Sequence, residues 1–407
     1  MPVVRALAGW RYRSSKVGAA QAPVRLDQFK RILLLRLDEI GDMMLTSPLL
    51  RELRRNLPQA RITLVVKPGV HNLVALCPYV DEVLTFDWHG YGFAEPFQRH
   101  WRAITFARRF LRNRHFELAI LPRWDIDWYH GTMLSYLSGA TKRVGFSEQV
   151  NSNKKRFNRG FDRLLTDQFG DSGMKHDAQH SLDVIGFLGG RVCDDRLELW
   201  VGPEDEMFAD ELLRHRQVSS TAMIVALGIG AGLKKRQWPW ECYGQIGRWL
   251  QREFDARIIV IGGPQDRSAG GALQNFLGKT AIDITGTTTL RQTAAVLKRC
   301  ALYVGNDAGP MHIAAAAQIP VVEISCHPKS GSLWSANSPL RFGPWGTRAA
   351  IIQPANGLIP CTEECNATVP HCILGIDVQQ VKEVLTAMLS REELICRNHH
   401  GDSIHTL

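Results

Sequence analysis

The chain has 407 residues, of which 45% are hydrophobic and 22% charged, and its formal net charge is +9. This length favours two domains, each large enough to bury a core. Because the sequence lacks an apolar run of about 18 residues, and its first 30 residues lack a signal-like apolar block, we expect neither a transmembrane helix nor a secretory signal. Nine cysteines without an export signal favour reduced thiols and a cytoplasmic protein.

Residues 1–29 are expected to form a basic, flexible leader. The first 30 residues carry six basic side chains against the single acid Asp27, a local charge of +5: Arg5, Arg11, Arg13, Lys16, Arg25 and Lys30. With Trp10 and Tyr12, this segment is either a solvated tail or a peripheral contact with an anionic membrane, where each cation contributes about 1 kcal/mol. The remaining cations are scattered, so nucleic acid is not an expected partner.

Strand-like and helix-like segments alternate through residues 30–195, which we predict to form the first domain. An apolar run at 31–37 predicts the first strand, and 41–56 reads as a helix that Pro48 either kinks or begins. Further strands are expected at 60–66, 81–86 and 116–122, with a helix at 97–114. The polar stretch 145–180 is interpreted as a long loop or surface segment.

The second domain is predicted to span residues 196–375, followed by a closing helix and tail at 376–407. An acidic stretch at 193–213 suits a hinge between the domains. Strands are expected at 222–228, 256–263, 301–306 and 319–325, with helices at 240–254, 289–300 and 378–389. This alternation predicts an α/β protein with two Rossmann-like domains facing across a cleft, and ligands at the carboxyl ends of the strands.

The segment YVGNDAGPMHIAAAAQIPVVEI, residues 303–324, contains the most distinctive turn of the chain. Gly309 allows a ligand to approach the backbone, and Pro310 suits a first helical turn because its missing N–H is not needed there. The helix start would then offer amide groups and a partial positive charge to a phosphate. His312 lies in the first turn, and the following alanines allow close packing on the sheet. A helix merely capped by Asp307 is the alternative.

Two other strand-end loops of the same domain carry similar signals. The sequence GIGAGLKKRQWP, residues 228–239, places Gly230 before three successive cations, which favours a pyrophosphate over a solvated charge run. In IGGPQDR, residues 261–267, two glycines precede an acid that either accepts hydrogen bonds from ribose or caps a helix. The candidate residues of the two loops are Lys234, Lys235, Arg236, Gly262, Gly263 and Asp266.

The first domain supplies a candidate base. Gly41 and Asp42 follow the first predicted strand, so the Asp42 carboxylate is expected to point into the cleft and to accept a proton from an attacking hydroxyl. The alternative is an acid that only complements the helix dipole, and Asp38 and Glu39 are nearby rivals.

Together these segments resemble glycosyltransferase family 9, the bacterial heptosyltransferases of lipopolysaccharide assembly. The similarity runs from about residue 30 to 390 through RILLLRLDEIGDMMLTSPLLRELRRNLPQARITLVV, GATKRVGF, KKRQWP, VIGGPQD and NDAGPMHIAAAAQIPVVEI. It implies a GT-B fold and inverting transfer from a nucleotide-sugar donor, here ADP-heptose, to an anionic, lipid-linked saccharide acceptor. It also implies a reaction without an obligatory metal or other cofactor.

The resemblance assigns roles residue by residue. Asp42 takes the place of the catalytic base. Arg236 takes that of the phosphate-binding lysine, a departure that leaves either Arg236 or Lys235 in that role. Donor contacts fall on the turn before and within the predicted helix: Asp307, Ala308, Gly309, Pro310, Met311 and His312. Ala308 replaces a commonly hydroxylated residue, so only its backbone N–H remains for phosphate. Acceptor-binding candidates are Arg36, Gly41, Arg123, Lys142 and Arg143, because the family's acceptors are anionic.

A cysteine-rich segment, PCTEECNATVPHC, falls at residues 360–372. Its side chains Cys361, Cys365, His371 and Cys372 have zinc-ligand chemistry, but their spacing matches no standard zinc module. A structural knot of undetermined redox state is the favoured interpretation, and no metal site is predicted.

Three functional classes remain open from the sequence. The favoured one is an inverting heptosyltransferase, with a different nucleotide-hexose donor as a variant. A non-catalytic nucleotide-sugar-binding relative is the second, motivated by the departures at Ala308 and Arg236. A Rossmann oxidoreductase is the third, although GIGAGLKK lacks the last glycine of its fingerprint. The favoured enzyme would work in the cytoplasm, where it would also reach the inner membrane surface.

Overall fold

The computed structural model describes residues 25–89, 95–170, 173–363 and 366–389, which form two compact units. Unit 1 comprises residues up to Gly173 together with Asp177–Asp195, and unit 2 comprises Met174–His176 and the chain from Arg196 onward. The leader expected at 1–29 lies outside the described residues except for 25–29, and the tail 390–407 lies outside them entirely.

Unit 1 is built on a six-stranded parallel sheet of order β3-β2-β1-β4-β5-β6. Its central strands are continuous apolar runs with almost every residue buried, as expected for parallel strands covered on both faces. The strands are β1 Arg31–Leu35, β2 Arg61–Val66, β3 Glu82–Thr85, β4 Leu118–Leu121, β5 Lys142–Phe146 and β6 Asp167–Phe169.

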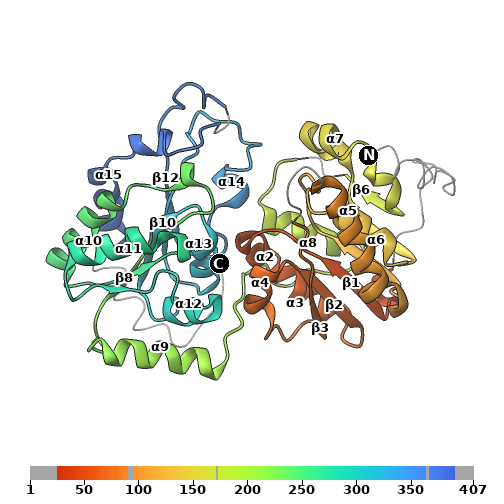
Figure 1. The fold of residues 1–407 in the computed structure, drawn as a ribbon, viewed down its shortest axis with the longest axis horizontal. Helices are drawn as coiled ribbons and strands as arrows, with labels where there is room; N and C mark the ends of the chain where they lie inside the picture. The colour runs from red at the N-terminus through yellow and green to blue at the C-terminus, as the bar shows by residue number, and fades with distance from the viewer. Residues whose placement is uncertain (1–24, 90–94, 171–172, 364–365, 390–407) are drawn as a thin grey trace. The chain divides into compact units, whose positions relative to one another are not determined.

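Helices flank this sheet, and α3 packs against α8 although the two are far apart in sequence (Figure 1). The helices are α2 Ile40–Leu45, α3 Ser47–Asn56, α4 Pro68–Val74, α5 Glu95–Phe106, α6 Gly131–Leu137, α7 Ser152–Asn158 and α8 Asp177–Phe187. A π-helical turn, Ala107–Leu111, extends α5, and short 3-10 turns lie at Leu26–Gln28, Arg112–Arg114, Glu148–Val150 and Phe161–Leu164.

Unit 2 repeats the plan with a sheet of order β12-β11-β10-β7-β8-β9. Read from its other edge, this is the same Rossmann order as in unit 1, with the topological switch between β7 and β10. The strands are β7 Ile224–Gly228, β8 Arg257–Ile261, β9 Ile282–Asp283, β10 Leu302–Asn306, β11 Val321–Ile324 and β12 Ala349–Ile352.

In unit 2, α10 packs with α11 and α15, whereas α12 packs with α9 and α13 (Figure 1). The helices are α9 Pro203–His215, α10 Trp240–Phe254, α11 Arg267–Leu277, α12 Leu290–Leu297, α13 Gly309–Ala316, α14 Pro339–Phe342 and α15 Val378–Leu389. Short 3-10 turns lie at Lys234–Arg236, Pro264–Asp266 and Cys372–Gly375. No helix among the described residues has the length and hydropathy needed to cross a membrane.

The predicted α/β class and the two Rossmann-like sheets are confirmed. Pro48 marks a true helix start, since α2 ends at Leu45 and α3 begins at Ser47. The interpretation of 145–180 as a long loop was wrong, because this stretch contains α7, β6 and the start of α8. Helix α7 was not recognised because Phe157 is its one apolar residue, so it has no apolar periodicity, yet it buries Lys154 and Asn158.

Two further expectations about the connection between the domains need correction. The second half of the predicted hinge 193–213 is helix α9, which packs on α12 through ion pairs such as Asp205–Arg291 at 2.9 Å. Residues 174–176, expected in the first domain, pack with unit 2: the His176 ring stacks on Trp345 with centroids 4.6 Å apart, and its Nε2 lies 3.0 Å from the Gly343 carbonyl oxygen.

Candidate active site

Asp42 lies in the first turn of α2, which begins just after β1 ends. Its Oδ2 accepts a hydrogen bond of 3.1 Å from the backbone N–H of Glu39, so the carboxylate caps its own helix. Its other oxygen, Oδ1, faces Arg36, and the side chain is 20% exposed. The expected base therefore also has the capping role that was its alternative, and one does not exclude the other.

A buried cluster of charges surrounds Asp42. The Arg36 guanidinium is 1% exposed and lies 2.6 Å from Asp177, 3.0 Å from Asp38 and 3.4 Å from Asp42. Arg123 also contacts Asp38, from the loop after β4. Three carboxylates thus share two guanidinium groups. Arg36 was expected to read acceptor charge, but because it is enclosed by these acids its place is behind Asp42, as a positioning residue.

This environment raises the pKa of Asp42 to about 6. Loss of solvation is the largest cause, and the negative charges of Asp38 and Asp177 act in the same direction, while Arg36 and Arg123 oppose them. A carboxyl group with a pKa near neutrality is still ionised at pH 7 but binds a proton more strongly than an ordinary aspartate, which suits a general base.

Of the other acceptor candidates, Arg123 is near Asp42 and two are not. Arg123 follows the carboxyl end of β4 and is 21% exposed, and its guanidinium lies 5.1 Å from the Tyr129 ring centroid. Lys142 and Arg143 begin β5, and Lys142 is level with Leu118 and Ile32, at the amino end of the sheet. Gly41 lies beside Asp42 in α2.

The assignment of Lys142 and Arg143 to the acceptor site is therefore wrong, because they lie at the sheet edge opposite Asp42. Their charged groups also have other partners. Lys142 Nζ lies 3.2 Å from Asp167, and the Arg143 guanidinium donates to the carbonyl groups of Leu164 and Ala140 at 2.6 Å each.

A small pocket in unit 1 adjoins this cluster. Asp38, Arg123, Asp127, Tyr129, Lys154 and Asp162 supply polar groups to its lining. Lys154, from α7, donates 3.2 Å hydrogen bonds to the carbonyl groups of Arg123 and Trp124. Burial lowers the pKa of Lys154 to about 8, against the opposing effect of Asp162 and other nearby acids.

In unit 2, the buried side chain of Asn306 joins the end of β10 to the loop after β7 and to helix α10. Asn306 ends β10, and its Oδ1 accepts hydrogen bonds of 2.9 Å from the Trp238 N–H and the Tyr243 hydroxyl. Its Nδ2 donates at 2.9 Å to the Ile229 carbonyl, in the loop after β7. This one amide fixes the glycine-rich loop and the cationic turn relative to the turn before α13.

Arg236 belongs to this arrangement through its own contacts. Its guanidinium lies 3.1 Å from Asp307 Oδ2 and donates two hydrogen bonds to Asn337 Oδ1, at 3.0 and 2.7 Å. Asp307 is buried, and burial raises its pKa while Arg236 lowers it. The arginine that replaces the expected lysine therefore neutralises a buried carboxylate beside the predicted phosphate site, and Lys234 and Lys235 lie in the same 3-10 turn.

The amino terminus of α13 is arranged as the sequence predicted. Ala308 is the residue before the helix, and it has no side-chain oxygen with which to cap it. Ala308, Gly309 and Pro310 are half-buried, whereas Met311 and His312 are buried. A ligand at this helix start would therefore meet backbone groups. The side chain of Met311 is fully buried, so a donor contact at this position would come from its backbone.

Asp266 has the capping role and not the exposed ribose-binding position. Its Oδ2 accepts from the Gly263 N–H at 2.8 Å and its Oδ1 from Gln237 Nε2 at 3.2 Å. A Cβ on Gly230 would lie 2.0 Å from Asp266 Oδ2, and one on Gly262 would lie 2.9 Å from its Cβ. These glycines are thus required by the close approach of Asp266, which holds two strand-end loops of unit 2 together.

Comparison with known proteins shows which enzymes this chain is similar to. Residues 203–370 match the model of Glycosyltransferase family 9 (heptosyltransferase). Lipopolysaccharide heptosyltransferase 2 of Salmonella typhimurium is 24% identical over 378 residues, covering 89% of this chain and 99% of the relative. The predicted resemblance to glycosyltransferase family 9 is confirmed. The protein is a glycosyltransferase, and the oxidoreductase and non-catalytic alternatives are not retained.

Solved family 9 structures share the GT-B fold of this glycosyltransferase. The glycosyl transferase family 9 protein of Veillonella parvula superposes with a TM-score of 0.74 at 22% identity, over 90% of this chain and 99% of that one. The ADP-heptose LPS heptosyltransferase II of Escherichia coli gives 0.64 at 20% identity, over 89% and 99%.

Three residues that contribute to the two candidate sites were not predicted from the sequence. Asp177 and Lys154 lie in the stretch interpreted as a loop, so no element was available to direct their side chains toward Asp42 or the pocket. Asn306 was visible at a strand end, but an asparagine there usually indicates a turn. No local pattern signals that its amide joins segments 63 to 77 residues away.

Proposed function

We propose that this glycosyltransferase transfers a heptose from ADP-heptose to a lipopolysaccharide core or similar anionic glycan, with inversion at the anomeric carbon. The observation that carries the proposal is Asp42, a partly exposed carboxylate at a strand end with its pKa raised to about 6. The match to the heptosyltransferase family model and the names of the relatives support heptose as the sugar.

The chemistry assigned to Asp42 is general-base catalysis. An acceptor hydroxyl attacks the anomeric carbon and gives its proton to the Asp42 carboxylate as the new C–O bond forms. The bond between that carbon and the diphosphate oxygen breaks on the opposite face, which inverts the configuration. Arg36 and the Glu39 N–H hold the carboxylate in place, so no rotamer search is needed when the substrate arrives.

Unit 2 is proposed to stabilise the departing diphosphate. As the C–O bond breaks, negative charge collects on the diphosphate, and preorganised donors in a site of low dielectric lower the barrier. Lys234, Lys235 and the backbone amides at the start of α13 supply such donors. We propose that the transfer step needs no metal ion at the phosphates, because these groups provide the required positive potential.

The acceptor is proposed to bind over the unit 1 pocket, with Arg123 as an anion contact. Arg123 is the one acceptor-binding arginine of the prediction that is both partly exposed and on the same sheet edge as Asp42. A lipid-linked acceptor would also bring the enzyme to the cytoplasmic face of the inner membrane. Co-sedimentation with anionic vesicles, compared with neutral ones, tests that contact.

The test of function is ADP release from ADP-heptose in the presence of truncated lipopolysaccharide, with mass analysis of the glycan. We expect ADP release and a mass increase of one heptose, and nuclear magnetic resonance of the product should show the inverted linkage. Parallel reactions with UDP- and GDP-hexoses test the donor. Turnover with one of these and none with ADP-heptose would contradict the proposed donor, and hydrolysis without glycan product would contradict the acceptor class. Brief EDTA treatment should leave the initial rate unchanged.

A further inference from the structure

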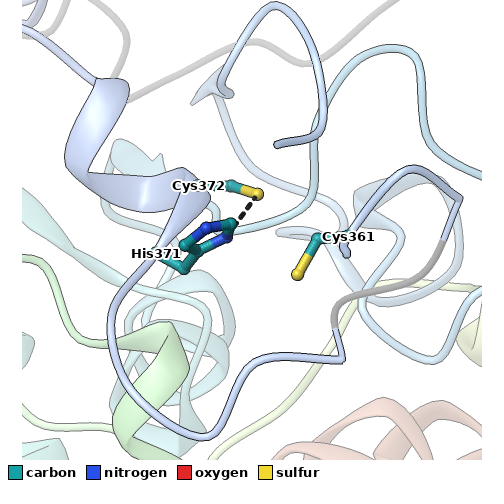
Figure 2. Close-up of side chains that lie close together, drawn as sticks. All are labelled: Cys361, His371 and Cys372. Atoms are coloured by element: carbon teal, nitrogen blue, oxygen red, sulfur yellow. Dashed lines mark hydrogen bonds between the residues drawn. The ribbon is translucent and has the colours of Figure 1, made fainter. Parts of the chain in front are cut away.

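Cys361, His371 and Cys372 converge at one point in unit 2 (Figure 2). The two Sγ atoms and a ring nitrogen of His371 all lie within 4.8 Å of one another. Cys361 and Cys372 are buried, and His371 is half-buried. We propose that these three side chains bind a divalent transition metal ion, with Zn²⁺ as the best match.

The distances fit the ligand geometry of zinc. With Zn–S near 2.3 Å and Zn–N near 2.0 Å, a tetrahedral ion holds a sulfur and a nitrogen about 3.5 Å apart and two sulfurs about 3.8 Å apart. Cys372 Sγ lies 3.4 Å from His371 Nδ1. The upper limit of 4.8 Å for the remaining separations exceeds the tetrahedral edge by about 1 Å, which small side-chain rotations can close.

Apolar packing of the two cysteines explains this cluster less well than metal binding does. Cys361 and Cys372 belong to the apolar core of unit 2 together with Ile373 and Ile376, and buried cysteines often act as small apolar side chains. Such a role requires neither two thiols at one point nor an imidazole against them. Two thiolates and one imidazole are a donor set that selects a soft or borderline cation, and they leave a fourth tetrahedral position to water or another donor.

The segment around the cluster would gain a crosslink from the ion. Between β12, which ends at Ile352, and the 3-10 turn that begins at Cys372, the described residues form neither helix nor strand. The Leu358 N–H donates to Cys372 Sγ at 3.4 Å, and the Ser332 N–H donates to the Glu363 carbonyl at 2.8 Å. An ion at this point would join residue 361 to residues 371 and 372 directly.

The crosslink would also act on the donor domain. Immediately after the turn Cys372–Gly375, the Ile376 carbonyl accepts a 3.2 Å hydrogen bond from Trp238 Nε1, and the Trp238 N–H is held by Asn306. Trp238 is two residues from Arg236. We assign the ion a structural role that orders this segment and its contact with Trp238, outside the bonds made and broken in transfer. Cys365 lies outside the described residues and is not part of the proposed site.

The test measures metal in the full-length protein, purified under reducing conditions without a metal-affinity tag. We expect about one zinc per chain by elemental mass spectrometry. Cys361→Ser and Cys372→Ser should each reduce this to below about one tenth, and His371→Asn should weaken retention by about 10- to 100-fold. Cys193→Ser, at an exposed cysteine of unit 1, is the matched control and should keep the metal. Cobalt substitution should give a thiolate-to-cobalt charge-transfer band that both serine variants lose.

Several outcomes would overturn the proposal. These are protein that neither contains nor takes up a stoichiometric ion, metal retained in both serine variants, or a Cys361–Cys372 disulfide in freshly reduced protein. Iron in place of zinc, lost in the same variants, would support the site. If a serine variant does not fold, chelation of the wild-type protein decides: reversible loss of the ion should lower the melting temperature, and an unchanged melting temperature would contradict the structural role. None of these measurements depends on the donor or acceptor.

Discussion

Asp177 Oδ2 accepts a 2.6 Å hydrogen bond from Arg36 Nη2, across 141 residues of sequence. Asp177 begins α8, and Arg36 follows β1, so the bond ties the last helix of unit 1 to its first strand. Arg36 also lies 3.4 Å from the proposed base, Asp42. The negative charge of Asp177 is one of the causes that raise the pKa of the Asp42 carboxyl, although loss of solvation is the largest.

We therefore expect kcat/KM to fall as the pH is lowered through about 6, because only ionised Asp42 accepts the acceptor's proton. The variant Asp177→Asn loses one of the negative charges that raise the pKa of Asp42. The fall of kcat/KM at low pH should therefore shift to lower pH, by up to about one pH unit. Arg36, Asp38 and Arg123 still face Asp42. Asp183→Asn, on the same helix, is the control. If Asp177→Asn lowered the rate equally at every pH and left the pH profile unshifted, Asp177 would have a structural role only.

Replacing Asp42 itself tests the base directly. Asp42→Ala should reduce kcat by at least about 10²- to 10⁴-fold, because the proton has no positioned acceptor. ADP affinity, measured by calorimetry, should remain unchanged, since Asp42 belongs to unit 1 and the proposed nucleotide-binding loops to unit 2. Asp27→Asn, at an exposed acid of unit 1, should retain full activity. Residual transfer together with collapsed nucleotide affinity would contradict the assignment.

Arg236 is expected to serve both stability and nucleotide binding. In Arg236→Met, Asp307 stays buried without its ion pair, and we expect the free energy of unfolding to fall by up to about 3 kcal/mol, discounted because Arg236 is 22% exposed. The Kd for ADP should rise about tenfold or more. The double variant Arg236→Met/Asp307→Asn separates the two effects. It should recover stability but not affinity, and recovery of both would show that Arg236 only neutralises Asp307.

Asn306 is expected to be important for the stability of unit 2. Asn306→Ala leaves the buried Trp238 N–H, the Tyr243 hydroxyl and the Ile229 carbonyl without this partner. We expect the free energy of unfolding to fall by about 3 kcal/mol in urea titrations. Asn275→Ala, at an exposed position of α11, should change it by less than about 0.5 kcal/mol. Equal effects of the two substitutions would contradict the joining role of Asn306.

Lys154 is expected to shape the acceptor pocket by holding the loop that carries Arg123. Lys154→Met should raise the KM for the acceptor about tenfold and leave the Kd for ADP unchanged, because the change is confined to unit 1. Lys155→Met, at the exposed neighbouring lysine, is the matched control. An unchanged acceptor KM in Lys154→Met would show that the pocket does not bind the acceptor.

Much of the site was predictable because its signals are local. The order of residue types alone predicts two strand-end turns. One is Gly41-Asp42 after an apolar run, and the other is Asn306 to Pro310 after a second apolar run. The apolar strands and the amphipathic helix 378–389 were also predictable from the sequence. Buried parallel strands are continuous apolar runs, and a helix with one buried face has a periodic apolar pattern. The proposed metal ligands were identifiable as residue types, but their spacing matches no standard zinc module.

The sequence by itself determined the alternation of strands and helices, the turn residues and the family, since each depends on near neighbours or on an ordered series of motifs. Only the tertiary structure decided that Arg36 supports Asp42, that Lys142 and Arg143 lie at the wrong sheet edge, and that Asp266 caps a turn. The physical reason is that charge and hydrogen bonding act through a few ångströms of space. Strand order and side-chain direction set those distances, and neither can be derived from the spacing of residues along the chain.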